Sequence, residues 1–297
     1  MEPEISKATA IRSLLDELKL SIDSMAHATI GQDGIYGCAL RSAIVKSFEF
    51  TALAHQDPPP AHAFFITATL RGICEDLITF AFLETLSKQK RNEALSLLNS
   101  ATMAEGVAAQ TEFFGASRRW QPVVHPYQNA TEVKQKLQIL GRSVGWTGKQ
   151  PWPTVWFMAK VTNLHALYNY LYSATSKWVH FSPQILFRMG WSGERDKKED
   201  LGNDTEWIFT TAHFSKYYAD FNSTYSLLLL LKMLQGPAAR LVPDTSKGVI
   251  AALDVCLNKP LRWPETVTFE ELNLEGPGTF ERMVLRVAHE SESSSDG

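Results

Sequence analysis

Two segments of the chain carry the residue types that an acid–base centre or a polar ligand site would use. In the first, between positions 63 and 82, the only ionisable side chains besides Cys74 are Arg71, Glu75 and Asp76. Arg71 and Glu75 are four residues apart and are therefore neighbours on one face of a helix. A charge among apolar residues is costly to desolvate. We infer that the pair is either a hydrogen-bonded structural pair or part of a site.

In the second segment, from 154 to 181, polar side chains recur every four residues. They are Tyr168, Tyr172, Ser176 and His180. At about 100° per residue this spacing forms a slowly turning ridge on a helix. An imidazole with its ordinary pKa near ~6.5 suits His180 for proton transfer, and a carboxylate such as Glu75 would orient it. The same spacing also fits a structural role, in which tyrosines and a histidine bridge core and solvent.

We therefore expect the two helices to face each other across a buried polar site. Arg71 would stabilise a phosphate, Glu75 would orient the imidazole, and His180 would move a proton, as the three catalytic residues. The expected substrate-binding residues are Tyr168, Tyr172 and Ser176. Two alternatives stay open. In the first, the protein is a non-catalytic interaction module and these residues form a structural network. In the second, it is a sensor that binds an anionic ligand through Arg71.

The stretches 70–84 (LRGICEDLITFAFLE) and 168–183 (YNYLYSATSKWVHFSP) resemble a bacterial family known only as domain of unknown function 5677. The family pairs an Arg-x3-Glu helix with a later helix that carries Tyr, Ser and His. The matching positions are Arg71, Glu75, Tyr168 or Tyr172, Ser176 and His180. The resemblance covers 39–183 and implies a helical bacterial protein of the cytoplasm without a settled activity.

Families of this kind are compared with the HEPN ribonucleases, whose signature is an Arg followed after four to six residues by a His. Arg119 and His125 match it formally, but Pro122 would break the helix that should carry them. A split version would use Arg71 and His180. This HEPN-like character implies an effector that acts on RNA or a nucleotide in a defence or toxin role.

The sequence contains no motif for a cofactor or a metal. The stretch 141–150 (GRSVGWTGKQ) differs from a phosphate loop at Ser143 and Gln150. Cys38, Cys74 and Cys256 lack the spacing of a thiolate zinc site or a disulfide framework. We expect neither a cofactor nor a metal.

Hydrophobic periodicity predicts a mostly α, multi-helix bundle. Helices are expected at about 6–28, 36–54, 61–86, 92–115, 154–181, 206–234 and 237–258. Residues 116–153, rich in Gly, Pro and Trp, predict an insertion around a short helix at 131–140. Near the C-terminus the stretch TVTF (266–269) predicts at most a minor strand. We expect one domain over 1–289, with a subdivision near 190–204 as an option, and a disordered acidic tail at 290–297.

The charge balance and the hydropathy indicate which kinds of partner to expect. The chain has 29 Lys and Arg against 32 Asp and Glu, a net charge of −3, which argues against a generally basic nucleic-acid surface but not against a local patch. No stretch has the ~20 apolar residues that span a bilayer, and the N-terminus lacks the apolar core of a secretion signal. The expected protein is cytoplasmic, without membrane contact, with RNA or a nucleotide as ligand and self-association as an open option.

Overall fold

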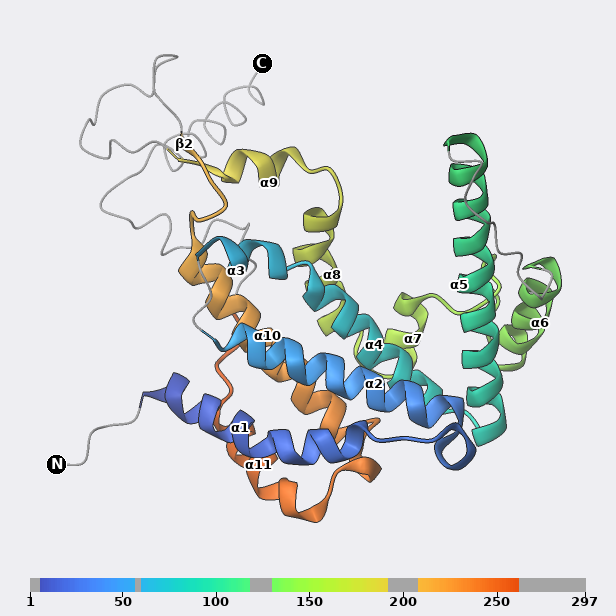
Figure 1. Ribbon diagram of the computed structural model, residues 1–297, viewed down its shortest axis with the longest axis horizontal. Helices are drawn as coiled ribbons and strands as arrows, with labels where there is room; N and C mark the ends of the chain where they lie inside the picture. The colour runs from blue at the N-terminus through green and yellow to red at the C-terminus, as the bar shows by residue number, and fades with distance from the viewer. Residues whose placement is uncertain (1–5, 57–59, 118–129, 192–207, 262–297) are drawn as a thin grey trace, which may run out of the picture.

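The structure, a computed structural model, describes residues 6–56, 60–117, 130–191 and 208–261 (Figure 1). The helices are α1 Lys7–Ala26, α2 Ile30–Ala54, α3 Pro60–Ile66, α4 Thr69–Glu84, α5 Lys88–Ser117, α6 Ala130–Ser143, α7 Val155–Val161, α8 His165–Val179, α9 Pro183–Arg188, α10 Ser215–Gln235 and α11 Lys247–Cys256, with 3-10 helices η1 Ala239–Leu241 and η2 Asp244–Ser246. The strands β1 Gly190–Trp191 and β2 Ile208–Phe209 pair antiparallel. The prediction of a mostly α, multi-helix fold is confirmed.

The central element is α10. Its residues include Phe221, Leu229, Leu230 and Met233, each with 0 % of its surface exposed. A helix that buries apolar residues on several sides needs other helices to cover them. It packs along α2 and against α3, α4 and α11, so these helices form the shell around it.

The first helix forms as its apolar spacing predicts. Ile11, Leu15, Leu18 and Ile22 follow one another at intervals of four and three and are all buried. The Ser6 hydroxyl caps the helix by accepting the first-turn N–H of Thr9 at 3.3 Å. The stripe packs α1 against α2 and α11, which closes the lower layer of the molecule as it is drawn in Figure 1.

The second helix starts six residues earlier than predicted, with a kink at Gly34, where φ is +69°. Glycine tolerates this left-handed backbone because it has no Cβ. A Cβ at Gly34 would lie 3.0 Å from Asn92 Oδ1. That oxygen accepts the backbone N–H of Tyr36 at 3.0 Å. The predicted start at 36 is thus the point where the helix becomes regular.

The helix predicted at 61–86 is divided between α3 and α4. At the break the carbonyl of Ala63 accepts hydrogen bonds from Thr67 Oγ1 at 2.9 Å and from Asn222 Nδ2 at 2.8 Å. Polar side chains that bond to backbone groups compete with the regular helical ladder. Because Asn222 belongs to α10, periodicity alone could not locate this break.

The helix predicted at 154–181 is also divided, into α7 and α8. Asn163 adopts a left-handed conformation with φ of +58°, and the N–H of Leu164 donates to the carbonyl of Ala159 at 2.8 Å. This is the closing hydrogen bond of a Schellman-type helix end. The left-handed residue of such an end is usually Gly and sometimes Asn. Tyr168, Tyr172 and Ser176 of the polar ridge therefore lie on α8, which begins at His165, whereas His180 follows its last residue.

The insertion contains the predicted short helix as α6, which packs beside α5 in a hairpin on one side of the molecule (Figure 1). After α6 the Trp146 ring lies over Gly148, where a Cβ would collide with it. Trp146 Nε1 donates to the carbonyl of Gln150 at 2.7 Å. Here the Gly and Trp content of the segment builds a defined turn.

In the C-terminal half, two of the predicted helices differ from those in the structure. The helix predicted from 206 begins only at Ser215, because 208–209 form β2 instead. The helix predicted at 237–258 consists of η1, η2 and the shorter α11, since Pro243 separates them in an extended conformation. The strand predicted at 266–269 and the tail at 290–297 lie outside the described residues.

Over the described ranges, no helix has the length and apolar character needed to cross a bilayer.

Stability should fall in mild acid because of His55 at the end of α2. Burial lowers the pKa of this imidazole below its ordinary 6.5; the hydrogen bond to the Thr51 carbonyl opposes this shift, and the Arg12 charge adds to it. Its Nδ1 donates to the Thr51 carbonyl at 2.9 Å. The unfolded chain binds the proton first as the pH drops through about 6.5, so the free energy of unfolding decreases there. In His55→Gln, urea denaturation at pH 7.5 and 5.5 should show a smaller decrease than in wild type.

The matched control is His180→Gln, because His180 is exposed. It should retain the full wild-type decrease. An unchanged decrease in His55→Gln would assign the acid sensitivity to other groups.

Candidate functional site

Arg71 and Glu75 form the ion pair that their spacing predicts. Arg71 Nε donates to Glu75 Oε1 at 2.9 Å, and this hydrogen bond raises the pKa of the guanidinium. The two side chains are 25 % and 31 % exposed. The prediction that this pair is buried is therefore wrong: the neighbouring Cys74 is in the core, but the pair lies at its edge.

Two tyrosines of α8 complete this cluster, because α8 packs against α4. The Arg71 guanidinium carbon lies 4.5 Å from the centre of the Tyr172 ring, a cation–π contact. The Tyr168 ring lies 5.4 Å from that of Tyr172. Burial, followed by the negative charge of Glu75, raises the pKa of the Tyr168 phenol. Tyr172 is 38 % exposed, so the cluster is open to solvent.

The other two predicted residues lie further along α8. Ser176 is half-buried one turn beyond Tyr172, and His180 is exposed at the helix end, where the backbone is extended. Eight residues separate Tyr172 from His180, which is about 12 Å along a helix axis. Trp178, in the same last turn, packs on Phe64 of α3 at 4.3 Å between ring centres. The structure thus brings Arg71 to Tyr172 but not to His180.

The arrangement suits recognition of a ligand that combines an anion with a planar ring. Glu75 holds the guanidinium through Nε, and among the described residues no hydrogen bond occupies the two terminal nitrogens of Arg71. Terminal guanidinium nitrogens are strong donors to phosphate or carboxylate. Arg planes and exposed aromatic rings are also the surfaces on which nucleobases stack.

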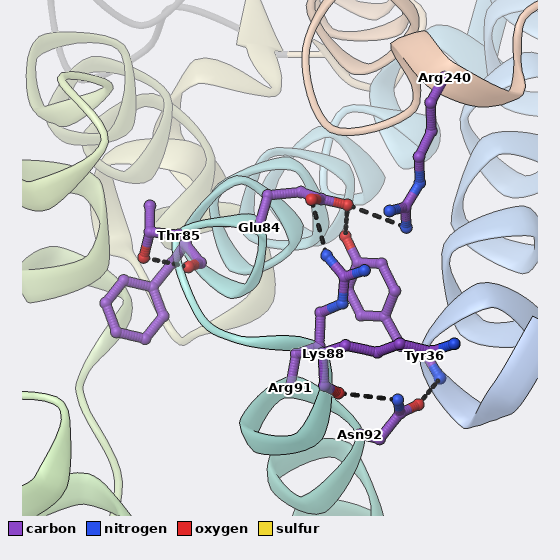
Figure 2. Close-up of polar contacts among 8 residues, drawn as sticks. Tyr36, Glu84, Thr85, Lys88, Arg91, Asn92 and Arg240 are labelled. Carbon is purple, nitrogen blue, oxygen red and sulfur yellow. Dashed lines mark hydrogen bonds and ion pairs between the residues drawn. The ribbon is translucent and has the colours of Figure 1, made fainter.

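A second polar cluster surrounds Glu84, and the sequence analysis missed it. Figure 2 shows Tyr36, Arg91 and Arg240 converging on this one carboxylate. Tyr36 Oη donates to Glu84 Oε1 at 2.7 Å, Arg91 Nη1 to Oε2 at 2.8 Å, and Arg240 Nη2 lies 3.1 Å from Oε1. These groups come from α2, α4, the start of α5 and η1. The cluster therefore joins segments that are distant in the sequence.

The Glu84 cluster is held together by charge as well as by hydrogen bonds. Both guanidinium groups lie over the Tyr36 ring, with their carbons 4.4 Å and 5.5 Å from its centre for Arg91 and Arg240. Burial and the hydrogen bond to Glu84 raise the pKa of the Tyr36 phenol far above its ordinary range. Only 12 % of the Arg91 side chain is exposed. One carboxylate thus compensates two cations, so the cluster depends on its charge.

Sequence reasoning could not find this cluster, because its members are separated by up to about two hundred positions and none forms a spaced motif. The one local signal is that Glu84 and Arg91 flank the turn between α4 and α5. Within the described ranges, no group of three or more His, Cys, Asp or Glu side chains could hold a metal ion.

Comparison of the chain with known protein families, curated proteins and solved structures finds no match. The resemblance to domain of unknown function 5677 and the HEPN-like character stay predictions. Arg119 and His125, the formal HEPN match, lie outside the described residues.

Glu84→Gln should destabilise the protein by about 2 kcal/mol. The amide retains the shape of the side chain but leaves two neighbouring guanidinium groups without an anion. Breaking a fully buried pair costs roughly 3–5 kcal/mol, and the partial exposure of Glu84 reduces this cost. The free energy of unfolding from urea titration at pH 7 measures it.

Asp76→Asn is the matched control, since it removes a carboxylate from the same helix. Its partner Lys46 is 50 % exposed, and exposed pairs contribute about 1 kcal/mol or less. Equal losses in the two variants would contradict the assigned role of the Glu84 cluster.

Proposed function

We propose that the protein is a ligand-binding module that recognises a nucleotide at the α4–α8 face, without catalysing a reaction there. The observation that carries the proposal is the guanidinium of Arg71, held by Glu75 at 2.9 Å and resting over the solvent-exposed ring of Tyr172. In this function the terminal nitrogens of Arg71 bind the phosphate. The base stacks on the guanidinium and tyrosine surface.

Binding fits the geometry better than catalysis does. A general acid or base must come within hydrogen-bond reach of the reacting group, directly or through one water. His180, the residue predicted to move a proton, is two helical turns from the ring on which Arg71 rests. Of the functions predicted from the sequence, the sensor that uses Arg71 therefore has the strongest support, ahead of an RNA-directed defence or toxin enzyme.

A purely structural network is the competing function, and exposure argues against it. A pair that is 25 % and 31 % exposed contributes about 1 kcal/mol or less. We therefore expect Arg71→Ala to remain folded. A network that holds the core together would instead unfold when Arg71 is removed.

Ligand-observed NMR titration with AMP tests the proposed function. Wild type should bind AMP, and Arg71→Ala should weaken binding at least about tenfold, because a hydrogen bond to a charged group contributes roughly 1.5–3 kcal/mol. Arg71→Lys should restore only part of the loss, since an ammonium keeps the charge but not the plane. Melting curves of each variant check that it is folded.

Two control variants separate the site from general charge effects. Lys46→Ala removes a cation that pairs with Asp76 on α4, and it should leave AMP binding unchanged. His180→Ala should also bind AMP like wild type. The proposal fails if wild type does not bind AMP, or if folded Arg71→Ala binds it equally well.

A further inference from the structure

A second aromatic–cation pair lies at the corner between α7 and α8. Lys160 Nζ is 3.7 Å from the centre of the Trp156 ring. The Trp156 ring meets that of His165 edge to face, 5.5 Å between ring centres. Trp156 is 45 % exposed although it is among the largest apolar side chains. Indole is the best aromatic partner for a cation, so this pair repeats the chemistry of Arg71 and Tyr172.

The two pairs share one side of α8. His165, Asn169 and Tyr172 are separated by four and three residues, which places them in one sector of the helix. Asn169 Nδ2 lies 3.1 Å from His165 Nε2, which links the first turn of α8 to the second. Both α7 and α8 also pack against α4, the helix that carries Arg71 (Figure 1). His165 at the Trp156 end and Tyr172 at the Arg71 end therefore lie on the same side of α8.

The length of this surface exceeds what one nucleotide base can cover. Seven residues separate His165 from Tyr172, which is about 10 Å along the helix. One base can stack at the Tyr172 end, while a second is needed to reach Trp156. The repeat of a cation beside an exposed aromatic ring therefore suits two or more bases of one strand.

We propose that this surface, the α7–α8 strip of Trp156, Lys160, His165, Tyr168, Tyr172 and Arg71, binds single-stranded nucleic acid over at least two successive nucleotides. The inference rests on the proposed function, because it extends the same nucleotide site. Single-strand binding proteins combine cations along the backbone with aromatic side chains on which successive bases stack. Stacking tolerates any base, so the affinity of the strip should depend on the number of nucleotides rather than on their sequence.

The charge of the strip sets the kind of binding to expect. Arg71 and Lys160 contribute two positive charges, and Glu75, which pairs with Arg71, contributes one negative charge, in a chain with a net charge of −3. Few phosphates can be neutralised, so affinity should depend only weakly on salt compared with a basic nucleic-acid binder. Stacking then supplies the larger part of the affinity.

The test compares AMP with the RNA tetranucleotide AAAA on the full chain. Wild type should bind the tetranucleotide at least about tenfold more tightly than AMP, since stacking of one base is worth roughly 1–3 kcal/mol. Trp156→Ala should remove this gain and leave the affinity for AMP unchanged. Arg71→Ala should weaken both ligands.

Two further variants guard against a folding defect. Trp156→Phe keeps an aromatic plane and should restore most of the gain with length. Phe113→Ala removes an exposed ring from α5, outside the strip, and should bind both ligands like wild type.

The outcomes distinguish the inference from the function on which it rests. If AMP does not bind, or binds without Arg71, the proposed function itself fails. If AMP binds through Arg71 but the tetranucleotide binds no more tightly, the strip does not take a second nucleotide. A gain that persists in folded Trp156→Ala also overturns the inference.

Discussion

Most residues of α10 must be kept from water, and this requirement organises the fold. Its buried leucines and aromatic residues are covered by α2, α3, α4 and α11, while Lys216, Asp220 and Lys232 stay exposed. Burial of apolar surface is the dominant favourable term in folding. Packing on α10 fixes the inner face of α4 and leaves another face for α7 and α8. This arrangement brings Arg71 of α4 beside Tyr172 of α8.

The two polar clusters show how burial separates a structural from an accessible charge. Only 12 % of the Arg91 side chain is exposed; its guanidinium lies over the Tyr36 ring and its charge is compensated by Glu84. Arg71 has one carboxylate on one edge and an exposed ring beneath it. The first arrangement joins distant parts of the chain. The second leaves donor groups that a ligand can use, at little cost to the fold.

Much of the fold could be predicted from the sequence, because apolar spacing reports which helix faces are buried. The α1 stripe and the apolar core of α10 are examples. Helix breaks could not be predicted this way, since they depend on partners from elsewhere in the chain. Asn222 of α10 bonds to the carbonyl of Ala63 at the end of α3. A periodic pattern contains no information on such a contact.

The candidate site was predictable only in part, for a related reason. The spacing in the sequence correctly predicted that Arg71 lies beside Glu75 and Tyr168 beside Tyr172, because the two residues of each pair belong to the same helix. It could not show that α8 ends at Val179 or that His180 lies beyond the site. It also gave no weight to Trp156, whose importance comes from Lys160 and from the Asn163 turn that brings α7 against α8.

Photocrosslinking of a short RNA that contains 5-bromouridine would show whether the α4–α8 face binds nucleotides. Ultraviolet light joins this base to aromatic side chains that it touches, and peptide mass spectrometry locates the bond. If the α4–α8 face binds nucleotides, crosslinks should fall on Tyr172 and Trp156 and should decrease in Arg71→Ala. Crosslinks confined to other residues, such as the Trp146 turn, or equally strong in Arg71→Ala, would contradict the account.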